Sequence, residues 1–408
     1  MKALSDMKFV VVGNGIAGVS AAQVIAQESQ RAEIAIYTQE PYHYYPRPKL
    51  WEFLAGETKI EELFFYPPSW YEERGIKVHL KSRVRGLDVA GKRLALADGR
   101  EIAYDRLLLA NGSVPSVPPV EGVDKEGVFT LRSLDDALAI KEYAGKVSKA
   151  VVIGGGLLGL ETARALSLSG LEVTVLEFFP WLLPRQLDPE GAKVLTSKIE
   201  AMGLRVMTGA NTEVILGAER AAGVLLKDGR EVKGELILFS AGIVPSIKLA
   251  QGAGLVVNKG IVVDDYLRTS APDIYAAGDV AEHRGKIYGI IPASREQASV
   301  AARNMLGQDS KYEGTIPSNT LKIVGIDLTA IGLINPEGEG YQVLRKETPE
   351  VYKKFVLQDG QLVGAILLGD RESVAPVSRL IRSQVNISAH AEKLLDEDFD
   401  LKSLPKEN

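Results

Sequence analysis

Two stretches of the chain share one order of apolar and polar positions. In residues 7–40, the apolar run Phe9–Val12 leads into a glycine-rich turn, a segment with apolar residues at helical spacing, and a second apolar run over residues 34–37. Residues 150–177 repeat this order. Short apolar runs joined by an amphipathic helix are typical of buried parallel strands. The pattern therefore predicts two β-α-β units of the same design.

Other parts of the chain show the spacing of antiparallel strands. Residues 93–102 and 224–232 are each interrupted by an Asp-Gly pair, which favours a tight hairpin turn. Beyond about residue 315 we expect a smaller α+β domain, with a polar tail from about Asp396. Its predicted strands cover residues 321–324, 341–344, 352–357 and 362–368.

Length, composition and charge narrow the class of protein. A chain of 408 residues is long enough for two or three domains, and 46% hydrophobic with 25% charged residues is ordinary for a globular protein. The net charge of −5 argues against a nucleic-acid partner. No apolar run approaches the roughly 20 residues that span a bilayer, so we expect a cytoplasmic protein. The acidic stretch of residues 390–402 would be repelled by anionic lipid, so we expect no membrane binding. The four histidines show no metal-ligand spacing.

The first glycine-rich turn is Gly13-Asn14-Gly15-Ile16-Ala17-Gly18. In such a fingerprint the first glycine permits a tight turn, the second lets a pyrophosphate approach the backbone, and the third lets helix and strand pack closely. The positive end of the following helix then favours the phosphates. Strand, turn, helix and second strand together predict a dinucleotide site. The acid that binds its ribose is expected near Thr38, and Glu40 is the candidate.

The second fingerprint is Gly154-Gly155-Gly156-Leu157-Leu158-Gly159, which begins 154 − 13 = 141 residues after the first. Here an acid closes the second strand, because Glu177 follows the first glycine by 177 − 154 = 23 residues. A carboxylate at this place hydrogen-bonds the adenosine ribose hydroxyls and repels an added 2′-phosphate. Arg185 is the one nearby cation that could favour that phosphate. The unit therefore predicts an NADH site.

Two further motifs resemble flavin-binding elements. Ala110-Asn111-Gly112 ends an apolar strand, and the run Thr269–Val280 contains Gly278-Asp279. Together with the fingerprints, they make almost the whole chain resemble the FAD-dependent pyridine nucleotide oxidoreductases of the glutathione-reductase structural type. The resemblance implies FAD in the first unit, with Asp279 accepting a hydrogen bond from a ribityl hydroxyl. The structural alternative for Asp279 is a helix N-cap.

Within this group the chain is most similar to NADH:rubredoxin oxidoreductases and to the flavin module of assimilatory NADH-dependent nitrite reductases. The stretch over residues 40–50 is the most discriminating, although Pro46 interrupts the run found in rubredoxin reductases and Lys49 replaces an arginine. Residues 291–298 and 319–328 are similar to the same group.

The resemblance also implies roles for several charged residues. Arg47 and Lys49 would lie near the flavin ring, and a helix that begins near Pro292 would direct its positive end at that ring. Glu161 would contact the nicotinamide carboxamide, and Lys322 would reach the flavin from the third domain. Lys49, Glu161 and Lys322 are therefore the candidate catalytic residues. Each of these positions has a structural alternative as an ordinary surface charge.

The fingerprints and the resemblance together define two sets of cofactor contacts. The predicted FAD contacts are Gly13, Gly15, Ile16, Ala17, Gly18, Glu40, Arg47, Lys49, Ala110, Asn111, Gly112, Gly278, Asp279, Pro292, Ala293 and Lys322. The predicted NADH contacts are Gly154, Gly156, Leu157, Leu158, Gly159, Glu161 and Glu177.

The predicted architecture is an α/β fold with two Rossmann-like dinucleotide-binding domains, for FAD and for NADH, and a small C-terminal α+β domain. We expect the FAD-binding domain in two parts, residues 7–117 and 243–314. The NAD-binding domain would cover residues 118–242 and the C-terminal interface domain residues 315–408.

The chain contains no cysteine and so has no thiol to relay electrons from a flavin. The resemblance then implies an FAD-dependent NADH oxidoreductase that passes electrons to an external acceptor such as rubredoxin. One alternative is the flavin module of a nitrite-reductase-like complex with an iron–sulfur partner subunit. The others are an NADH oxidase that makes hydrogen peroxide and a non-enzymatic NADH-sensing flavoprotein. A monomer and a homodimer both stay open.

Overall fold

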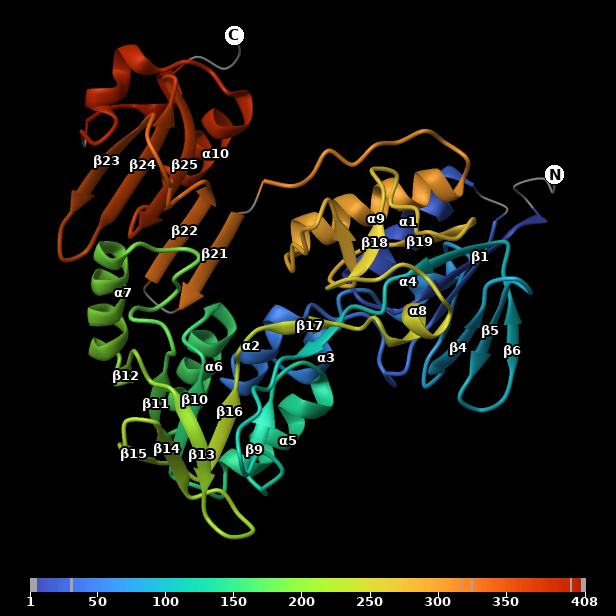
Figure 1. The fold of residues 1–408 in the computed structure, drawn as a ribbon, viewed down its shortest axis with the longest axis horizontal. Coiled ribbons are helices and arrows are strands. Elements are labelled where there is room, and N and C mark those ends of the chain that lie inside the picture. Colours follow the sequence, from blue (N-terminus) through green and yellow to red (C-terminus); the bar gives the residue numbers. More distant parts are fainter. Residues whose placement is uncertain (1–5, 30–31, 317, 324–325, 397, 405–408) are drawn as a thin grey trace. The chain divides into compact units, whose positions relative to one another are not determined.

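The computed structural model describes residues 6–29, 32–316, 318–323, 326–396 and 398–404 of the chain. These residues form two compact units (Figure 1). The first unit combines the residues up to Phe53 with Thr58–Ser116 and Ile243–Thr315. The second combines Leu54–Glu57 and Val117–Gly242 with the residues from Ile316 onward.

The first unit is built around one strand-helix-strand segment and strands that join it from later in the chain. Its elements are β1 (Lys8–Val12), α1 (Ile16–Glu28), β2 (Glu33–Tyr37), η2 (Arg47–Lys49), α2 (Leu50–Leu54), α3 (Ile60–Leu63), α4 (Pro68–Glu72), β3 (Ile76–His79), β4 (Val84–Asp88), β5 (Arg93–Leu96), β6 (Glu101–Ala103), β7 (Arg106–Leu109), β8 (Ser113–Pro115), β17 (Ile243–Pro245), α8 (Lys248–Gly252), β18 (Ile261–Val263), β19 (Ile274–Ala276), β20 (Ala281–His283) and α9 (Ile291–Met305).

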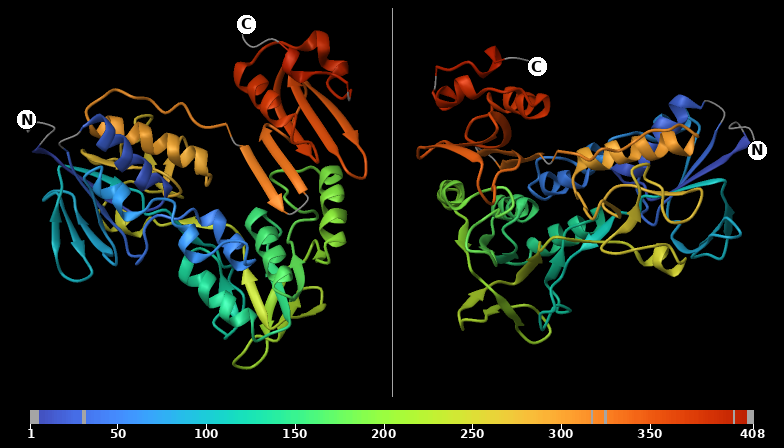
Figure 2. Two further views of the ribbon diagram at one scale, coloured as in Figure 1. Left: turned by 180° about the vertical axis from the view of Figure 1, so that it is seen from behind. Right: turned by 45° about the horizontal axis from the view of Figure 1, so that its top comes forward.

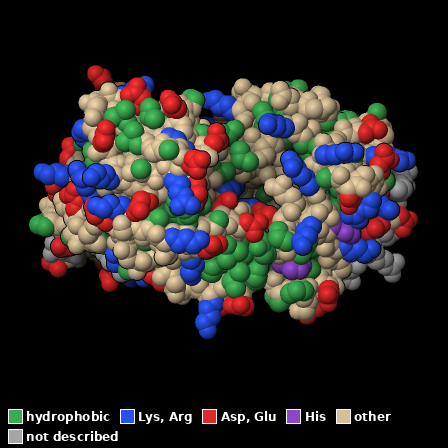
Figure 3. Space-filling view, turned by 90° about the horizontal axis from the view of Figure 1, so that it is seen from below, with side chains coloured by type: hydrophobic (Ala, Val, Ile, Leu, Met, Phe, Trp, Pro, Cys, Tyr) green, Lys and Arg blue, Asp and Glu red, His purple; other side chains and the backbone are tan. Residues whose placement is uncertain are grey.

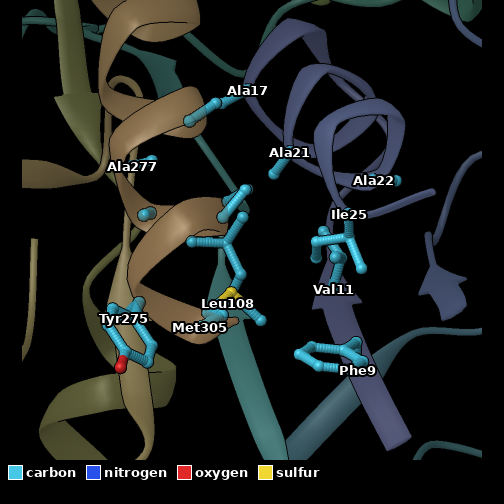
Figure 4. Close-up of a cluster of buried hydrophobic side chains, with 14 of the residues drawn as sticks. Phe9, Val11, Ala17, Ala21, Ala22, Ile25, Leu108, Tyr275, Ala277 and Met305 are labelled. Carbon is cyan, nitrogen blue, oxygen red and sulfur yellow. The ribbon is translucent and has the colours of Figure 1, made fainter. Parts of the chain in front are cut away.

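A five-stranded parallel sheet in the order β19-β7-β1-β2-β3 forms the centre of this unit. Because side chains alternate along a strand, Phe9 and Val11 face one side and Val10 and Val12 face the other. Helices α1 and α9 lie side by side over the first face (Figures 1 and 2). Figure 4 shows Ile25 of α1 and Met305 of α9 packed against that face. Burial on both faces explains the continuous apolar runs in these strands.

The second face of this sheet packs against a small antiparallel sheet, β4-β5-β6, and against α8, β18 and β20. The turn between β5 and β6 contains Gly99 at φ +90, which a glycine adopts without strain. The hairpin predicted around this Asp-Gly pair is therefore confirmed. A two-stranded antiparallel ribbon of β8 and β17 pairs Val114 with Val244.

The second unit contains the second strand-helix-strand segment and the C-terminal residues. Its elements are β9 (Val128–Thr130), α5 (Leu134–Ala144), β10 (Lys149–Ile153), α6 (Leu157–Leu168), β11 (Glu172–Leu176), α7 (Pro189–Ala201), β12 (Arg205–Met207), β13 (Thr212–Leu216), β14 (Gly223–Leu226), β15 (Glu231–Lys233), β16 (Leu236–Phe239), β21 (Ser318–Ile323), β22 (Ile326–Gly332), β23 (Tyr341–Glu347), β24 (Tyr352–Gln358), β25 (Gln361–Leu368), α10 (Val374–Ser383), η3 (Ser388–Lys393) and η4 (Leu401–Ser403).

The described residues of the second unit form a parallel sheet, a small antiparallel sheet and a C-terminal antiparallel sheet. The parallel sheet β12-β11-β10-β16-β9 repeats the design of the first unit, and the antiparallel sheet β13-β14-β15 shares a core with one of its faces. The C-terminal sheet, β21-β22-β25-β24-β23, is antiparallel throughout. One of its faces buries Phe355 and Leu367 against Leu380 of α10. The other face carries Tyr352 and Lys354 toward α7.

The α/β fold class with two Rossmann-like units is confirmed, as are both β-α-β units and both hairpins. The predicted C-terminal strands correspond to β21, β23, β24 and β25, although residue 324 lies outside the described residues. Strand β22 was missed although its apolar and polar residues alternate as in a half-buried strand, because residues 319–328 were interpreted only through their family resemblance. The division at residues 117, 242 and 314 stays a prediction.

Within the described residues, no helix has the length and apolar character needed to cross a membrane. The same residues contain no cluster of three or more histidines and carboxylates arranged to hold a metal ion.

Two leucines of the second unit test the packing of its parallel sheet. Leu238 on β16 is fully buried, whereas Leu138 on α5 is 38% exposed. We expect Leu238→Ala to lower the free energy of unfolding by about 2–5 kcal/mol, because it removes packing atoms and leaves a cavity. Leu138→Ala should change that free energy by about 0.5 kcal/mol or less. Chemical denaturation followed by circular dichroism measures both, and equal effects would contradict the packing described.

Two candidate dinucleotide sites

The first glycine of each fingerprint packs against the residue that follows the neighbouring parallel strand, β7 in the first unit and β16 in the second. Gly13 adopts φ +108 and Gly154 adopts φ +120, a region that residues with a side chain rarely enter. A Cβ at Gly13 would collide with the backbone oxygen of Ala110, and a Cβ at Gly154 would collide with that of Ser240. The two units therefore use the same turn for the same steric reason.

The third glycine of each fingerprint lets the helix pack onto that turn. A Cβ at Gly18 would overlap the carbonyl oxygen of Gly13, and a Cβ at Gly159 would overlap that of Gly154. Since any side chain would push the helix away, α1 and α6 reach their strands only with glycine at this place.

The second glycine of each fingerprint is the residue that a pyrophosphate would approach. Gly15 is the N-cap of α1 and Gly156 is the N-cap of α6. As glycines, they have no side chain that could accept a hydrogen bond from the first-turn N–H groups. Among the described residues, nothing comes within 4 Å of a Cβ built at either position. Each helix thus presents its positive end and its first N–H groups to open space, which fits an anionic pyrophosphate. The residues present in both units fit a bound dinucleotide.

Three elements of the first unit converge on its fingerprint. Gly278 adopts φ +83, and a Cβ there would lie 3.0 Å from the Ala17 Cβ and 3.6 Å from the Ser294 Oγ in the first turns of α9. The Gly278 N–H donates to the Oε1 of Gln297, a buried residue on the same helix, over 2.9 Å. The fingerprint, the second flavin motif and the start of α9 therefore meet, as the resemblance implied for FAD.

Asp279 lies in a turn between β19 and β20, and no helix begins there, so its structural alternative as an N-cap does not apply. Its Oδ2 accepts a hydrogen bond from the Ser113 hydroxyl over 2.8 Å. Nearby in the chain, the Asn111 amide donates to the backbone oxygen of Ser246 over 2.7 Å. Gly112 accepts from the Ser246 N–H over 2.9 Å. Both flavin motifs are thus held in place by polar contacts.

Helix α9 begins at Ile291, as expected from the sequence, with Pro292 in its first turn and Ala293 buried. Proline suits this place because it has no N–H to leave unpaired. The helix has no side-chain cap, so its 15 residues present an unneutralised positive end.

Glu40 and Arg47, predicted for different parts of FAD, contact each other. The Arg47 Nη2 lies 2.6 Å from the Glu40 Oε1, and the Tyr45 hydroxyl donates to the Glu40 Oε2 over 2.5 Å. Burial opposes the charge of Arg47, but the neighbouring Tyr45 and Glu40 outweigh it and raise the pKa of Arg47. Lys49 ends the same 3-10 helix and is exposed. The contacts of Glu40 with Tyr45 and Arg47 therefore hold the two ends of the 40–47 stretch together.

Glu177 is buried at the end of β11, with 6% of its surface exposed. Its Oε2 accepts from the Gly155 N–H and its Oε1 accepts from the Phe179 N–H, both over 2.8 Å. Two backbone donors therefore fix this carboxylate beside the second fingerprint. Phe178 and Phe179, which follow it, are 61% and 50% exposed.

The remaining candidates lie in the second unit. Leu157 and Leu158 begin α6, and Glu161 is half-buried one turn further along it. Lys322 lies on β21, an edge strand of the C-terminal sheet that contacts α6, and its side chain lies outside the described part of the structure. The roles of Lys49, Glu161 and Lys322 stay predictions.

Three residues that position the first site were not predicted. Tyr45 and Gln297 lie inside the stretches of family resemblance, so each was within a recognised motif without an assigned contact. Ser246 follows β17, 135 residues from Asn111, and no local pattern indicates that the two meet.

Two family profiles of known proteins match the chain. The profile of the pyridine nucleotide-disulphide oxidoreductase family matches residues 7–304, and that of the rubredoxin NAD+ reductase C-terminal domain matches residues 317–385. The nitrite reductase [NAD(P)H] of Bacillus subtilis (strain 168) is 37% identical over 94% of the chain and 48% of its own length. The NADH-rubredoxin oxidoreductase of Clostridium acetobutylicum is 31% identical over 90% of the chain and 92% of its own length.

Solved structures share the fold. The crystal structure of a covalent putidaredoxin reductase–putidaredoxin complex aligns with a TM-score of 0.87 at 26% identity, covering 97% of each chain. The chain spans about half the length of the first curated nitrite and nitrate reductase relatives, between 41% and 51%.

We call each glycine fingerprint, together with the start of the helix that follows it, a cradle. The fold, the two cradles and the relatives define a flavoprotein oxidoreductase with two dinucleotide sites, a class whose cofactors are FAD and NADH. The chain belongs to the pyridine nucleotide-disulphide oxidoreductase family. The resemblance stated from its motifs is confirmed.

The collision at the first glycine can be separated from backbone strain with a matched pair. Gly13 and Gly99 both have positive φ. Of these two glycines, only Gly13 has atoms of described residues within 4 Å of an added Cβ. We expect Gly99→Ala to cost about 1–2 kcal/mol and to keep its FAD. Gly13→Ala should lose most of its FAD and cost more, because the backbone of Ala110 after the neighbouring strand β7 must move. FAD per chain after purification measures this, and equal retention by both variants would contradict the cradle.

Proposed function

We propose that this chain is the flavoprotein component of an NADH-dependent electron-transfer system, and that its acceptor is an iron–sulfur protein such as rubredoxin. The observation that carries the proposal is the duplicated cradle, in which one copy holds a buried acid for NADH and the other is surrounded by the flavin motifs. FAD, when bound, accepts hydride from NADH and can release the two electrons singly.

The residues of the first unit would bind and orient FAD. Gly13, Gly15 and Gly18 would admit the pyrophosphate to the N-terminus of α1. Asp279, held by Ser113, would accept a hydrogen bond from the ribityl chain. The positive end of α9 would stabilise negative charge on the reduced ring.

The residues of the second unit would select the nucleotide. Two backbone donors leave the Glu177 carboxylate one orientation, so its remaining lone pairs can accept from the ribose hydroxyls. A 2′-phosphate would meet this buried negative charge, and like charges in contact cost several kcal/mol. This supports NADH as the reductant.

The absence of thiols in the chain supports an external electron acceptor. None of its 408 residues is cysteine, so no dithiol of this chain can take them from the flavin. Arg47 and Arg295 both lie close enough to Tyr44 to act on it, since they oppose the burial that raises the pKa of Tyr44 to about 12. Arg295 and Lys49 are exposed and place positive charge on one part of the first unit, whereas Arg47 is paired with Glu40.

That positive charge is local. The net charge of the chain is −5, and Figure 3 shows acidic and basic side chains mixed over the face that it draws. An acidic acceptor would therefore be attracted by this group and not by the protein as a whole.

A second candidate function is the flavin module of a nitrite-reductase-like assembly. The relative from Bacillus subtilis, named a nitrite reductase, is 37% identical, and the chain matches about half of it. In that case an iron–sulfur partner would take the place of rubredoxin. The hydrogen-peroxide-forming NADH oxidase and the NADH sensor are the remaining alternatives.

The nucleotide assignment is tested at Glu177. We expect Glu177→Ala to lower the ratio of kcat/KM for NADH over NADPH about 10- to 100-fold, because each tenfold step corresponds to ~1.4 kcal/mol of removed repulsion and lost ribose contact. Steady-state turnover with each nucleotide and an artificial electron acceptor measures the ratio. Glu172→Gln, on the same strand but exposed and paired with Lys149, is the control and should leave it unchanged. An unchanged ratio in Glu177→Ala would count against the NADH site.

The acceptor is tested by following rubredoxin bleaching after NADH addition without oxygen. Rapid bleaching would support the proposal, and we expect Lys49→Glu to slow it about tenfold at low salt and less at high salt. Lys77→Glu is the control, since the Lys77 ammonium faces Glu33 at the opposite end of the sheet. If NADH reduces the flavin while rubredoxin stays oxidised, the acceptor assignment is wrong. Hydrogen peroxide on admitting oxygen would then indicate the oxidase, and a long-lived reduced complex the sensor.

A further inference from the structure

The loop of residues 178–187 connects the nucleotide-binding acid to helix α7. At its first end, the Phe179 N–H donates to Glu177 and the Phe179 oxygen accepts from the Gly209 N–H over 2.9 Å. Leu182 of this loop lies against Gly155, 2.5 Å from where a Cβ would be. The loop therefore forms one wall of the second fingerprint, and its conformation sets the position of the Glu177 carboxylate.

The second end of the loop is Asp188, the N-cap of α7, which is 4% exposed. Its Oδ1 accepts from the Gly191 N–H over 3.0 Å. Its Oδ2 accepts from the Tyr352 hydroxyl over 2.6 Å and lies 2.9 Å from the Lys354 Nζ. Lys354 is 2% exposed, and both Tyr352 and Lys354 lie on β24 of the C-terminal sheet. Arg345 of the adjacent strand β23 lies 3.6 Å from the same Asp188 oxygen. The end of the nucleotide loop is thus held by a buried ion pair.

Two further contacts make this attachment specific. The Lys354 ammonium donates to the Asn335 Oδ1 over 3.2 Å, and the Asn335 amide donates to the backbone oxygen of Leu187 over 3.4 Å. Gly191 lacks the Cβ that would lie 2.9 Å from the Tyr352 ring, so α7 can approach the sheet closely. The C-terminal sheet therefore contacts both the loop and the helix that follows it.

Burying an ion pair removes two charges from water, which carries a desolvation free-energy penalty. Burial disfavours the charged Asp188, but the hydrogen bonds from Tyr352 and Lys354 outweigh it and lower the pKa of Asp188. Apolar residues of similar volume often stabilise a protein as well as such a pair does, so its presence favours a role in fixing a geometry. The geometry that it fixes is the end of the nucleotide loop.

We propose that Asp188, Tyr352 and Lys354 are positioning residues for the adenosine half of NADH, through which the C-terminal sheet sets the nucleotide affinity of the neighbouring dinucleotide site. The inference rests on the proposed function of Glu177. Its ligand class is an adenosine diphosphate ribose, and its consequence is that whatever binds or displaces β24 also changes the affinity for NADH.

The test measures ADP-ribose binding to the full-length, FAD-containing protein by calorimetry. We expect about threefold weaker binding for Tyr352→Phe and about tenfold weaker binding for Asp188→Asn, which keeps an N-cap but removes the charge. KM for NADH should rise by the same factors. The rate of flavin reduction at saturating NADH should stay unchanged, since the loop acts on binding and not on the reacting atoms.

Glu350→Gln is the matched control. Lys198 of α7 also forms an ion pair with Glu350, which lies in the connection between β23 and β24, but the Glu350 side chain is 81% exposed. Its removal should leave ADP-ribose affinity unchanged.

The outcomes separate three cases. Equal ADP-ribose affinity in wild type, Tyr352→Phe and Asp188→Asn would overturn the inference, and Tyr352→Phe decides alone if Asp188→Asn does not fold. A matching loss of FAD content and of the saturating rate would show a merely structural role and would also overturn it. If the wild type itself binds no ADP-ribose, the proposed function of Glu177 is wrong, and the inference falls with it.

Discussion

The contact on which both sites depend lies between the first glycine of each fingerprint and the residue that follows the neighbouring parallel strand. At Gly13 and Gly154 the chain turns with φ above +100 directly over Ala110 and Ser240. That turn directs the following helix so that its first N–H groups face open space. Without it, neither α1 nor α6 would present a phosphate site. The same solution in two places is the physical basis for assigning two dinucleotides to one chain.

Local patterns predicted the elements that these contacts require. Apolar runs of four residues, each followed by a glycine fingerprint, identified β1, α1, β10 and α6 without any knowledge of distant contacts. Glu177 was identified by its distance from Gly154, and the structure finds it buried and held by two N–H groups. Strand β22 was missed although Asp327 and Thr329 alternate with apolar residues, which is typical of a half-buried strand. Burial of a strand is decided by its neighbours, and these are not local in sequence.

The contacts between distant segments were beyond such patterns. The ribose contact of Glu40 stays a prediction, and no local pattern indicated that its two oxygens also contact Arg47 and Tyr45. Asp188 and Lys354 are 354 − 188 = 166 residues apart, and only the folded unit shows that they pair. Both cases join charges whose partners depend on tertiary structure. In the second case, the pair links the C-terminal sheet to the loop beside Glu177, which gives that sheet a direct physical connection to the nucleotide site.

The central claim is that one cradle holds FAD and the other holds NADH. The most direct measurement is an anaerobic titration of the purified protein with NADH, followed through the flavin absorbance. The account predicts one FAD per chain, bleached completely by about one equivalent of NADH, since each nucleotide delivers two electrons as hydride. A purified chain that holds no flavin, or a bound flavin that NADH leaves oxidised, would contradict it.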